Sequence, residues 1–200
     1  MLRNDGEMHV KAGSVAVALA VTAALTFAAH AQSIEEKAQI CAACHGENGV
    51  PQQQPFPVPA IWGQQLGYLF FQLRDFKSGT RKNETMSPIA EGLERQDLMA
   101  LAQYFSKKPW PGLQQPHASG AVATQAQRVN NSVVCTSCHQ EGFKGDGTQP
   151  RLAGQNRDYL QKTMTDFRTG ARANNPGMSD FMKSVSDADI AALADWLAGL

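Results

Sequence analysis

Two cysteine pairs, each followed at once by a histidine, are the residues of this 200-residue chain best suited to chemistry. The first segment reads Cys41-Ala-Ala-Cys44-His45 and the second reads Cys135-Thr-Ser-Cys138-His139. Cysteines three residues apart share one helix face, so both thiols can reach the two vinyl groups of one porphyrin. The next residue then points its imidazole at the iron from the same side. This spacing is typical of covalent haem attachment, and it predicts two haem c groups with His45 and His139 as proximal ligands.

Other uses of the same residues fit the pattern less well. A structural zinc ion takes four ligands, whereas one Cys-x-x-Cys-His segment supplies three. A thioredoxin-like dithiol pair lies near a strand–helix–strand unit, and the sequence has no alternating strand pattern of useful length. Disulfides would use the four cysteines but would leave the adjoining histidines unexplained.

The two motifs belong to a longer internal repeat, whose copies are offset by 91 to 94 residues. Outside the cysteines, the matched segments include Pro59–Gln64 with Pro150–Gln155, Asp75–Gly79 with Asp166–Gly170, and Asp97–Ala102 with Asp189–Ala194. We therefore predict an all-α protein with two tandem domains, each a small helical fold around one covalent haem. The predicted domains span residues 32–108 and 124–200, and residues 109–123 form an irregular linker.

Helix signals recur within each copy. Ser33-Ile-Glu-Glu36 has the pattern of a capping box and predicts the start of the helix that carries the first cysteine pair. Apolar segments predict helices over Tyr68–Lys77, ending at Gly79, and over about Tyr159–Thr169, ending at Gly170. The last helix of each copy has apolar residues at helical spacing: Leu98, Leu101, Ala102 and Phe105, then Ile190, Leu193, Ala194 and Leu197.

The sixth ligand decides what a haem does, and a methionine opposite histidine is typical of electron transfer. Met86 and Met178 occupy equivalent loop positions in the two copies, which predicts them as axial ligands. Met99 and Met164 lie within predicted helices, where filling the core is the expected role. In the second copy Met182 is the alternative ligand.

The first 31 residues have the features of a secretory signal peptide. A polar start with Arg3 and Lys11 precedes an apolar stretch over residues 12–27, and Ala29-His30-Ala31 predicts cleavage after Ala31. The alternative is an uncleaved membrane anchor. We expect a periplasmic protein that associates with membranes only through partners or an uncleaved signal. The balance of 18 basic and 18 acidic residues argues against nucleic-acid binding.

The doubled Cys-x-x-Cys-His, Pro-x-x-x-Gly-Gln and methionine pattern resembles the cytochrome c4 family of two-haem class I cytochromes c. The resemblance covers about Ile34 to Leu200. It implies cytochrome c-like helical domains, iron ligated by histidine and methionine, and a periplasmic role in carrying electrons toward terminal oxidases. It also implies that the backbone carbonyls of Pro59 and Pro150 accept the proximal imidazole N–H and so fix the ring.

These features favour an electron carrier over an enzyme. It would pass single electrons between redox proteins, from a donor such as a quinol-oxidising complex or a dehydrogenase to an acceptor such as a terminal oxidase. The alternative is a dihaem cytochrome subunit of a larger dehydrogenase or oxidase complex. A haem peroxidase or gas sensor would need an iron with an open or displaceable sixth position, and a methionine is available in each copy to close it.

Overall fold

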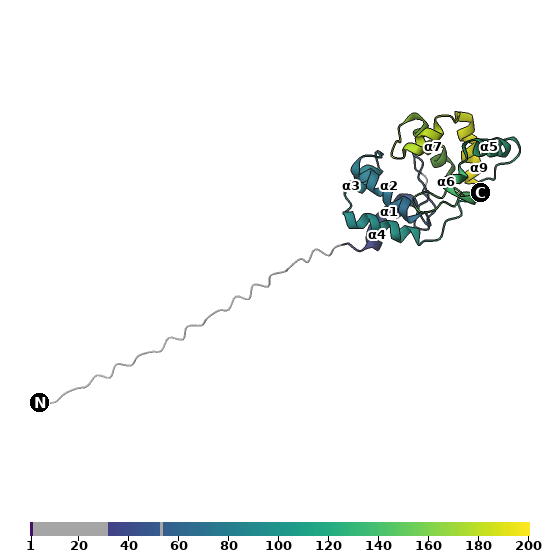
Figure 1. Ribbon diagram of the computed structural model, residues 1–200. Helices are drawn as coiled ribbons and strands as arrows, with labels where there is room; N and C mark the ends of the chain where they lie inside the picture. Colours follow the sequence, from purple (N-terminus) through teal and green to yellow (C-terminus); the bar gives the residue numbers. More distant parts are fainter. Residues whose placement is uncertain (2–31, 53) are drawn as a thin grey trace. The chain divides into compact units, whose positions relative to one another are not determined.

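The computed structural model describes Met1, residues 32–52 and residues 54–200 (Figure 1). Its helices, in chain order, are α1 (Ile34–His45), α2 (Leu66–Ser78), α3 (Met86–Glu91), α4 (Arg95–Ser106), α5 (Gly120–Val133), α6 (Thr136–His139), the 3₁₀ turn η1 (Glu141–Phe143), α7 (Arg157–Thr169), α8 (Pro176–Met182) and α9 (Asp187–Ala198). The described residues form no strand, only one isolated bridge between Asp146 and Gln149. The predicted all-α class is confirmed.

The predicted signal peptide lies outside the described residues. Among the helices of the described part of the chain, none is both long and apolar enough to cross a membrane.

Local signals place most helix ends where the sequence predicted them. The Ser33 side chain accepts a hydrogen bond from the Glu36 amide, and the Glu36 side chain accepts one from the Ser33 amide, which completes the capping box of α1. Helices α2 and α7 both end at a left-handed glycine, Gly79 with φ 77° and Gly170 with φ 80°. These conformations favour glycine because it has no Cβ.

The prediction that Met86 and Met178 lie in loops is wrong. Met86 begins α3 and Met178 lies in the first turn of α8. The side-chain oxygen of Asn83 accepts a hydrogen bond from the Met86 amide at 2.8 Å, and that of Asn175 accepts one from the Met178 amide at 3.1 Å. These bonds satisfy amides that lack helical partners, so a short helix forms at each methionine.

The core-filling role predicted for Met99 is also wrong, because this side chain is 38% exposed on α4. Met164 on α7 is buried, as predicted.

The segment predicted as a linker is irregular only as far as Ser119, because α5 begins at Gly120. Helix α5 ends at Val134, which takes the left-handed conformation with φ 57° and ψ 47°. The second Cys-x-x-Cys-His segment therefore lies beyond a helix break, with Cys135 just before the short helix α6 and its other residues on α6. The first segment lies wholly on the unbroken α1.

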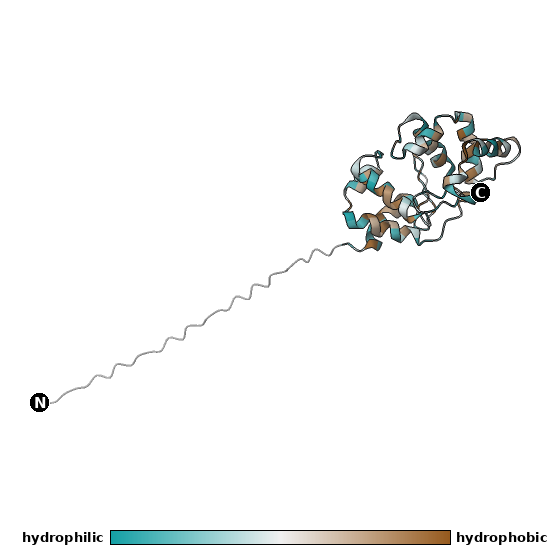
Figure 2. Ribbon diagram, in the orientation of Figure 1, coloured by the Kyte–Doolittle hydropathy of each residue, from teal (hydrophilic) through white to brown (hydrophobic). Residues whose placement is uncertain are grey.

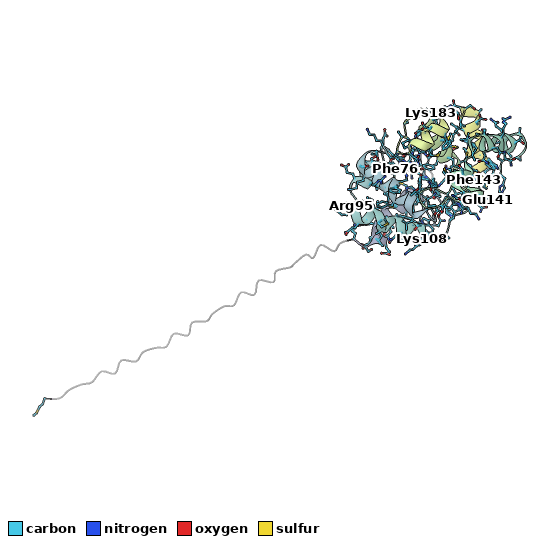
Figure 3. All side chains as sticks on the ribbon, viewed as in Figure 1. Phe76, Arg95, Lys108, Glu141, Phe143 and Lys183 are labelled. Carbon is cyan, nitrogen blue, oxygen red and sulfur yellow. The ribbon has the colours of Figure 1, made fainter. Side chains whose placement is uncertain are left out.

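Two separate hydrophobic clusters lie in the two halves of the chain, which we call the N-terminal half (residues 32–108) and the C-terminal half (residues 124–200). The first is built from α1, α2 and α4 and the second mainly from α5, α7, α8 and α9. Trp62 and Trp196 pack at the edges of these clusters, and Trp196 lies edge-on to Phe143. Phe143 is labelled in Figure 3. Polar and apolar residues alternate along the helices (Figure 2), as expected for helices that bury one face.

Candidate functional site

Each motif histidine is buried and bonded through one ring nitrogen. His45 ends α1 and His139 ends α6, with exposed fractions of 7% and 5%. Their Nδ1 atoms lie 2.8 Å from the Pro59 carbonyl oxygen and 3.0 Å from the Pro150 carbonyl oxygen. A carbonyl can only accept, so each Nδ1 carries the proton and donates it, which leaves Nε2 with a free lone pair.

Burial lowers the pKa of both imidazoles, and the bonds to the proline carbonyls offset only part of this effect. Both histidines are therefore held neutral and in one tautomer. This is the form of imidazole that binds a metal ion through Nε2.

The four motif cysteines form no disulfide with one another, and the two of each pair lie one helical turn apart. Desolvation raises the pKa of Cys41 to about 11 and also raises the pKa of Cys135. A raised pKa is the opposite of what a thiolate nucleophile needs. The described residues also contain no group of three His, Cys, Asp or Glu side chains arranged to hold a metal ion. The raised pKa values therefore argue against a reactive dithiol pair.

A cavity of about 570 Å³ runs past both motifs. Its walls include both histidines and all four cysteines, together with Val58, Leu69, Phe76, Leu101, Phe105, Leu160, Phe167, Leu193 and Leu197. Met86 lines it in the N-terminal half, whereas Met178, Met182 and Met164 line it in the C-terminal half. Met99 is not part of its wall. Each motif thus shares an apolar space with at least one methionine from a different helix.

Arg81 and Arg172 both lie in the cavity wall without an acidic partner. Arg81 contacts Gln72 and the ring of Phe76, and Arg172 contacts Asn174 and the ring of Phe167. No carboxylate of the described residues forms an ion pair with either guanidinium. A buried cation without a counter-ion is costly, so this part of the cavity favours an anion.

Two tyrosines complete this basic region, and each meets the arginine of the other half. Arg81 donates to the Tyr159 hydroxyl at 3.2 Å and Arg172 donates to the Tyr68 hydroxyl at 3.4 Å. Desolvation raises the pKa of Tyr159, but the charges of Arg81 and Arg172 outweigh it and lower the value to about 7. The positive charge of the two arginines is therefore not balanced by any carboxylate within this region.

Sequence reasoning identified the cysteines, histidines and methionines but missed this basic region. The signal was present, because Arg81 and Arg172 follow matched glycines in the two copies. Nothing in their spacing indicated burial, however, and a solvated surface is the usual place for arginine.

The residues present fit two haem groups. Thiols one helical turn apart are suitably placed for two vinyl groups, and a neutral imidazole follows each pair. Much of the cavity wall beside them is apolar. The unpaired arginines offer partners for the two propionates that each haem carries. Small helical folds with two such sites define a two-haem c-type cytochrome.

Comparisons with known proteins agree with this class. Residues 123–200 match the family model described as cytochrome c. Cytochrome c4 of Azotobacter vinelandii is 36% identical over 92% of this chain and 97% of its own. A thiosulfate dehydrogenase electron acceptor of Thiomonas intermedia is 32% identical over 91% of this chain and 89% of its own. The crystal structure of reduced cytochrome c4 from Pseudomonas stutzeri superposes with a TM-score of 0.73 at 31% identity, over 85% of this chain and 100% of that one.

The chain belongs to the cytochrome c4 family. It is an electron-transfer protein with two covalent haem c groups, as predicted from the sequence.

Proposed function

We propose that this protein carries single electrons in the periplasm, with one haem in each half. His45 and Met86 would ligate the iron in the N-terminal half, and His139 and Met178 would ligate the iron in the C-terminal half. The observation that carries the proposal is the pairing, along one apolar cavity, of a neutral histidine with a methionine at a matched position in each half. We further propose residues 32–108 and 124–200 as the two haem domains and residues 109–123 as their connection.

The haem supplies an iron that alternates between two oxidation states. The chain's own residues set how readily it does so. Cys41 and Cys44 in one half, and Cys135 and Cys138 in the other, anchor each group covalently. The Pro59 and Pro150 carbonyls hold the imidazole rings in place. Met86 and Met178 would each supply a thioether ligand, which would raise the reduction potential.

Two further features of the cavity would affect the reduction potential of the iron. The apolar wall excludes water, which disfavours the more highly charged oxidised iron. Arg81 and Arg172 would hold propionates at the boundary of the two halves. Together these residues would keep a bound iron ligated and enclosed, which suits electron transfer rather than substrate turnover.

We propose redox proteins as the partners. The Thiomonas intermedia relative, by its name, accepts electrons from a dehydrogenase, which supports a dehydrogenase as one class of donor. A quinol-oxidising complex is the other class of donor, and a terminal oxidase is the proposed acceptor. The second candidate function is a subunit of a dehydrogenase complex, which the same relative favours. Co-purification of the native protein with a flavin, quinone or copper subunit would support that candidate.

The visible spectrum of the reduced holoprotein, recorded with and without carbon monoxide, tests the ligand assignment. The wild type should show no change, because both irons are closed by methionine. Met86→Ala and Met178→Ala should each bind carbon monoxide at one of the two haems. A response of the wild type would overturn the proposal.

Two further variants sharpen this test. Met99→Ala is the matched control, because Met99 is exposed and lies outside the cavity wall. It should behave as the wild type. Met182→Ala distinguishes the two candidates in the C-terminal half: if it opens a haem and Met178→Ala does not, Met182 is the ligand.

A further inference from the structure

Two buried glutamines cross between the halves of the molecule. Gln155, in the C-terminal half, accepts from the Ala60 amide at 2.7 Å and donates to the Ala60 carbonyl at 2.9 Å. Gln64, in the N-terminal half, accepts from the Arg151 amide at 2.7 Å and donates to the Arg151 carbonyl at 3.0 Å. Both glutamines are 3% exposed. Each therefore holds one residue of the opposite half by two hydrogen bonds, shielded from water.

The residues held in this way adjoin the prolines that contact the histidines. The amide N–H of Ala60 and the carbonyl of Pro59 belong to one peptide group. Its nitrogen end donates to Gln155 and its oxygen end accepts from His45 at 2.8 Å. A continuous hydrogen-bonded chain thus runs from a side chain of the C-terminal half to the imidazole of the N-terminal half.

The same chain exists in the opposite direction. The peptide group between Pro150 and Arg151 donates to Gln64 at 2.7 Å and accepts from His139 at 3.0 Å. The two chains are reciprocal: each half supplies the glutamine that completes the histidine support of the other.

Such a chain acts on the imidazole through polarisation. A hydrogen bond accepted from a peptide N–H increases the negative charge on the carbonyl oxygen of the same peptide group, and successive bonds strengthen one another. The proline carbonyl then draws the Nδ1 proton more strongly, which makes the imidazole a stronger electron donor through Nε2. A stronger donor stabilises oxidised iron relative to reduced iron and so lowers the reduction potential.

We propose that Gln64 and Gln155 are positioning residues that tune the haem of the opposite half, so that docking of the two halves sets both potentials. This inference rests on the proposed role of His45 and His139 as iron ligands. Neither glutamine is hydrogen-bonded to a histidine, and each is linked to the imidazole of the opposite half through one peptide group.

Reciprocal variants of the holoprotein test the proposal in a redox titration followed by NMR. The methyl signals of Met86 and Met178, assigned with their alanine variants, report the two haems separately. Gln155→Leu should raise the potential of the N-terminal haem alone and Gln64→Leu that of the C-terminal haem alone. We expect an increase of about tenfold in the reduction equilibrium constant of that haem, equivalent to about 59 mV for a one-electron couple.

The Nδ1 proton signal of the histidine gives a second readout. In Gln155→Leu the signal of His45 should shift toward that of a weaker hydrogen bond, while the signal of His139 stays in place. A purely structural role, by contrast, would move both histidine signals and both potentials in either variant. That result, or a shift confined to the glutamine's own half, would overturn the proposal.

Gln155→Glu distinguishes the effect of the hydrogen bond from the effect of side-chain packing, because glutamate keeps the shape of glutamine. It also keeps the proposal testable if the leucine variant does not fold. A carboxylate still accepts from the Ala60 amide, and a protonated carboxyl restores both bonds, so the potential of the N-terminal haem should not rise. A rise equal to that of Gln155→Leu would contradict the polarisation mechanism. If the methionine signals are absent from the wild type, the ligand assignment itself has failed, which is a different outcome from unchanged potentials with intact signals.

Discussion

At the residue scale, the ion pair between Lys37 and Asp97 joins the first haem-binding helix to its neighbour. The Lys37 ammonium lies 2.6 Å from Asp97 Oδ2, with the side chains 19% and 9% exposed. The same oxygen accepts from the Glu94 amide at 3.0 Å and so caps α4. The hydrogen bond from Lys37 holds the pKa of Asp97 below its ordinary value of 3.8. One carboxylate therefore fixes both the position of α1 and the start of α4.

Asp97→Asn should lower the free energy of unfolding at neutral pH by about 2 kcal/mol, because it leaves a mostly buried ammonium without its counter-ion. Since folding depresses the pKa of Asp97, its contribution is full above pH 3.8 and is lost as the pH falls through the lower, folded-state value. The difference between variant and wild type should therefore shrink in acid. Urea unfolding of the holoprotein across this pH range measures it.

Asp189→Asn is the control for this experiment, because Asp189 occupies the matched position in the second copy. Its carboxylate accepts from the neutral Gln125 side chain at 2.8 Å instead of from a lysine. We expect a smaller loss than for Asp97→Asn, and equal losses would show that the ion pair contributes nothing beyond a neutral hydrogen bond.

At the scale of the elements, helix ends that are set by a residue's own backbone preference were predicted correctly. Short helices and helix breaks that depend on the surrounding structure were not predicted. Ser33, Gly79 and Gly170 act on their own backbone, so their sequence patterns locate helix ends directly. The helices at Met86 and Met178 are only six and seven residues long, too short for a periodic signal. The break at Val134 could not be predicted, because a β-branched residue disfavours the left-handed conformation found there.

Because of this break, we predict that glycine substitutions at two matched positions change the stability in opposite directions. These positions are the residues just before the first cysteine of each motif. Val134 is 54% exposed with φ 57°, whereas Ile40 is 57% exposed within the regular helix α1. Val134→Gly should stabilise the protein by about 0.5–1 kcal/mol, because it removes a Cβ from a left-handed residue. Ile40→Gly should destabilise it by about 1 kcal/mol, because glycine is a poor helix former. Thermal unfolding of the two holoproteins checks both signs, and destabilisation by both variants would contradict the break in α5.

At the scale of the whole molecule, the sequence predicted two haem-binding copies but not how they meet. The Gly-Gln pairs, Gly63-Gln64 and Gly154-Gln155, could be recognised as matched positions of the repeat. The hydrogen bonds of their glutamines to the other copy could not be predicted, because the spacing of residues along the chain does not show how the two copies pack. The same holds for the bonds from Arg81 to Tyr159 and from Arg172 to Tyr68. The haem-binding motif is repeated in the sequence and can be recognised there. The reciprocal contacts between the two halves form only in the folded molecule. For this reason candidate ligands could be proposed from the sequence, whereas the residues proposed to tune them could not.

The docking of the halves also depends on one close approach of the backbone. A Cβ added at Gly67 would lie 2.7 Å from the Gly147 carbonyl oxygen, which accepts from the Tyr68 amide at 3.2 Å. Gly67→Ala should therefore force the halves apart and cost about 1–3 kcal/mol, despite the better helix propensity of alanine in α2.

Calorimetry of the Gly67→Ala holoprotein should show two separated transitions, and small-angle scattering should show a larger radius of gyration, because the interface that couples the halves is weakened. Gly92→Ala is the matched control. Gly92 has φ −72° and its nearest neighbour, the Ile89 carbonyl oxygen, would lie 3.6 Å from the new Cβ, an ordinary contact. This variant should unfold as the wild type does. If Gly67→Ala also kept the wild-type midpoint and a single transition, close contact at Gly147 would not be what holds the halves together, and the two glutamines and the arginine–tyrosine bonds would have to supply that coupling alone.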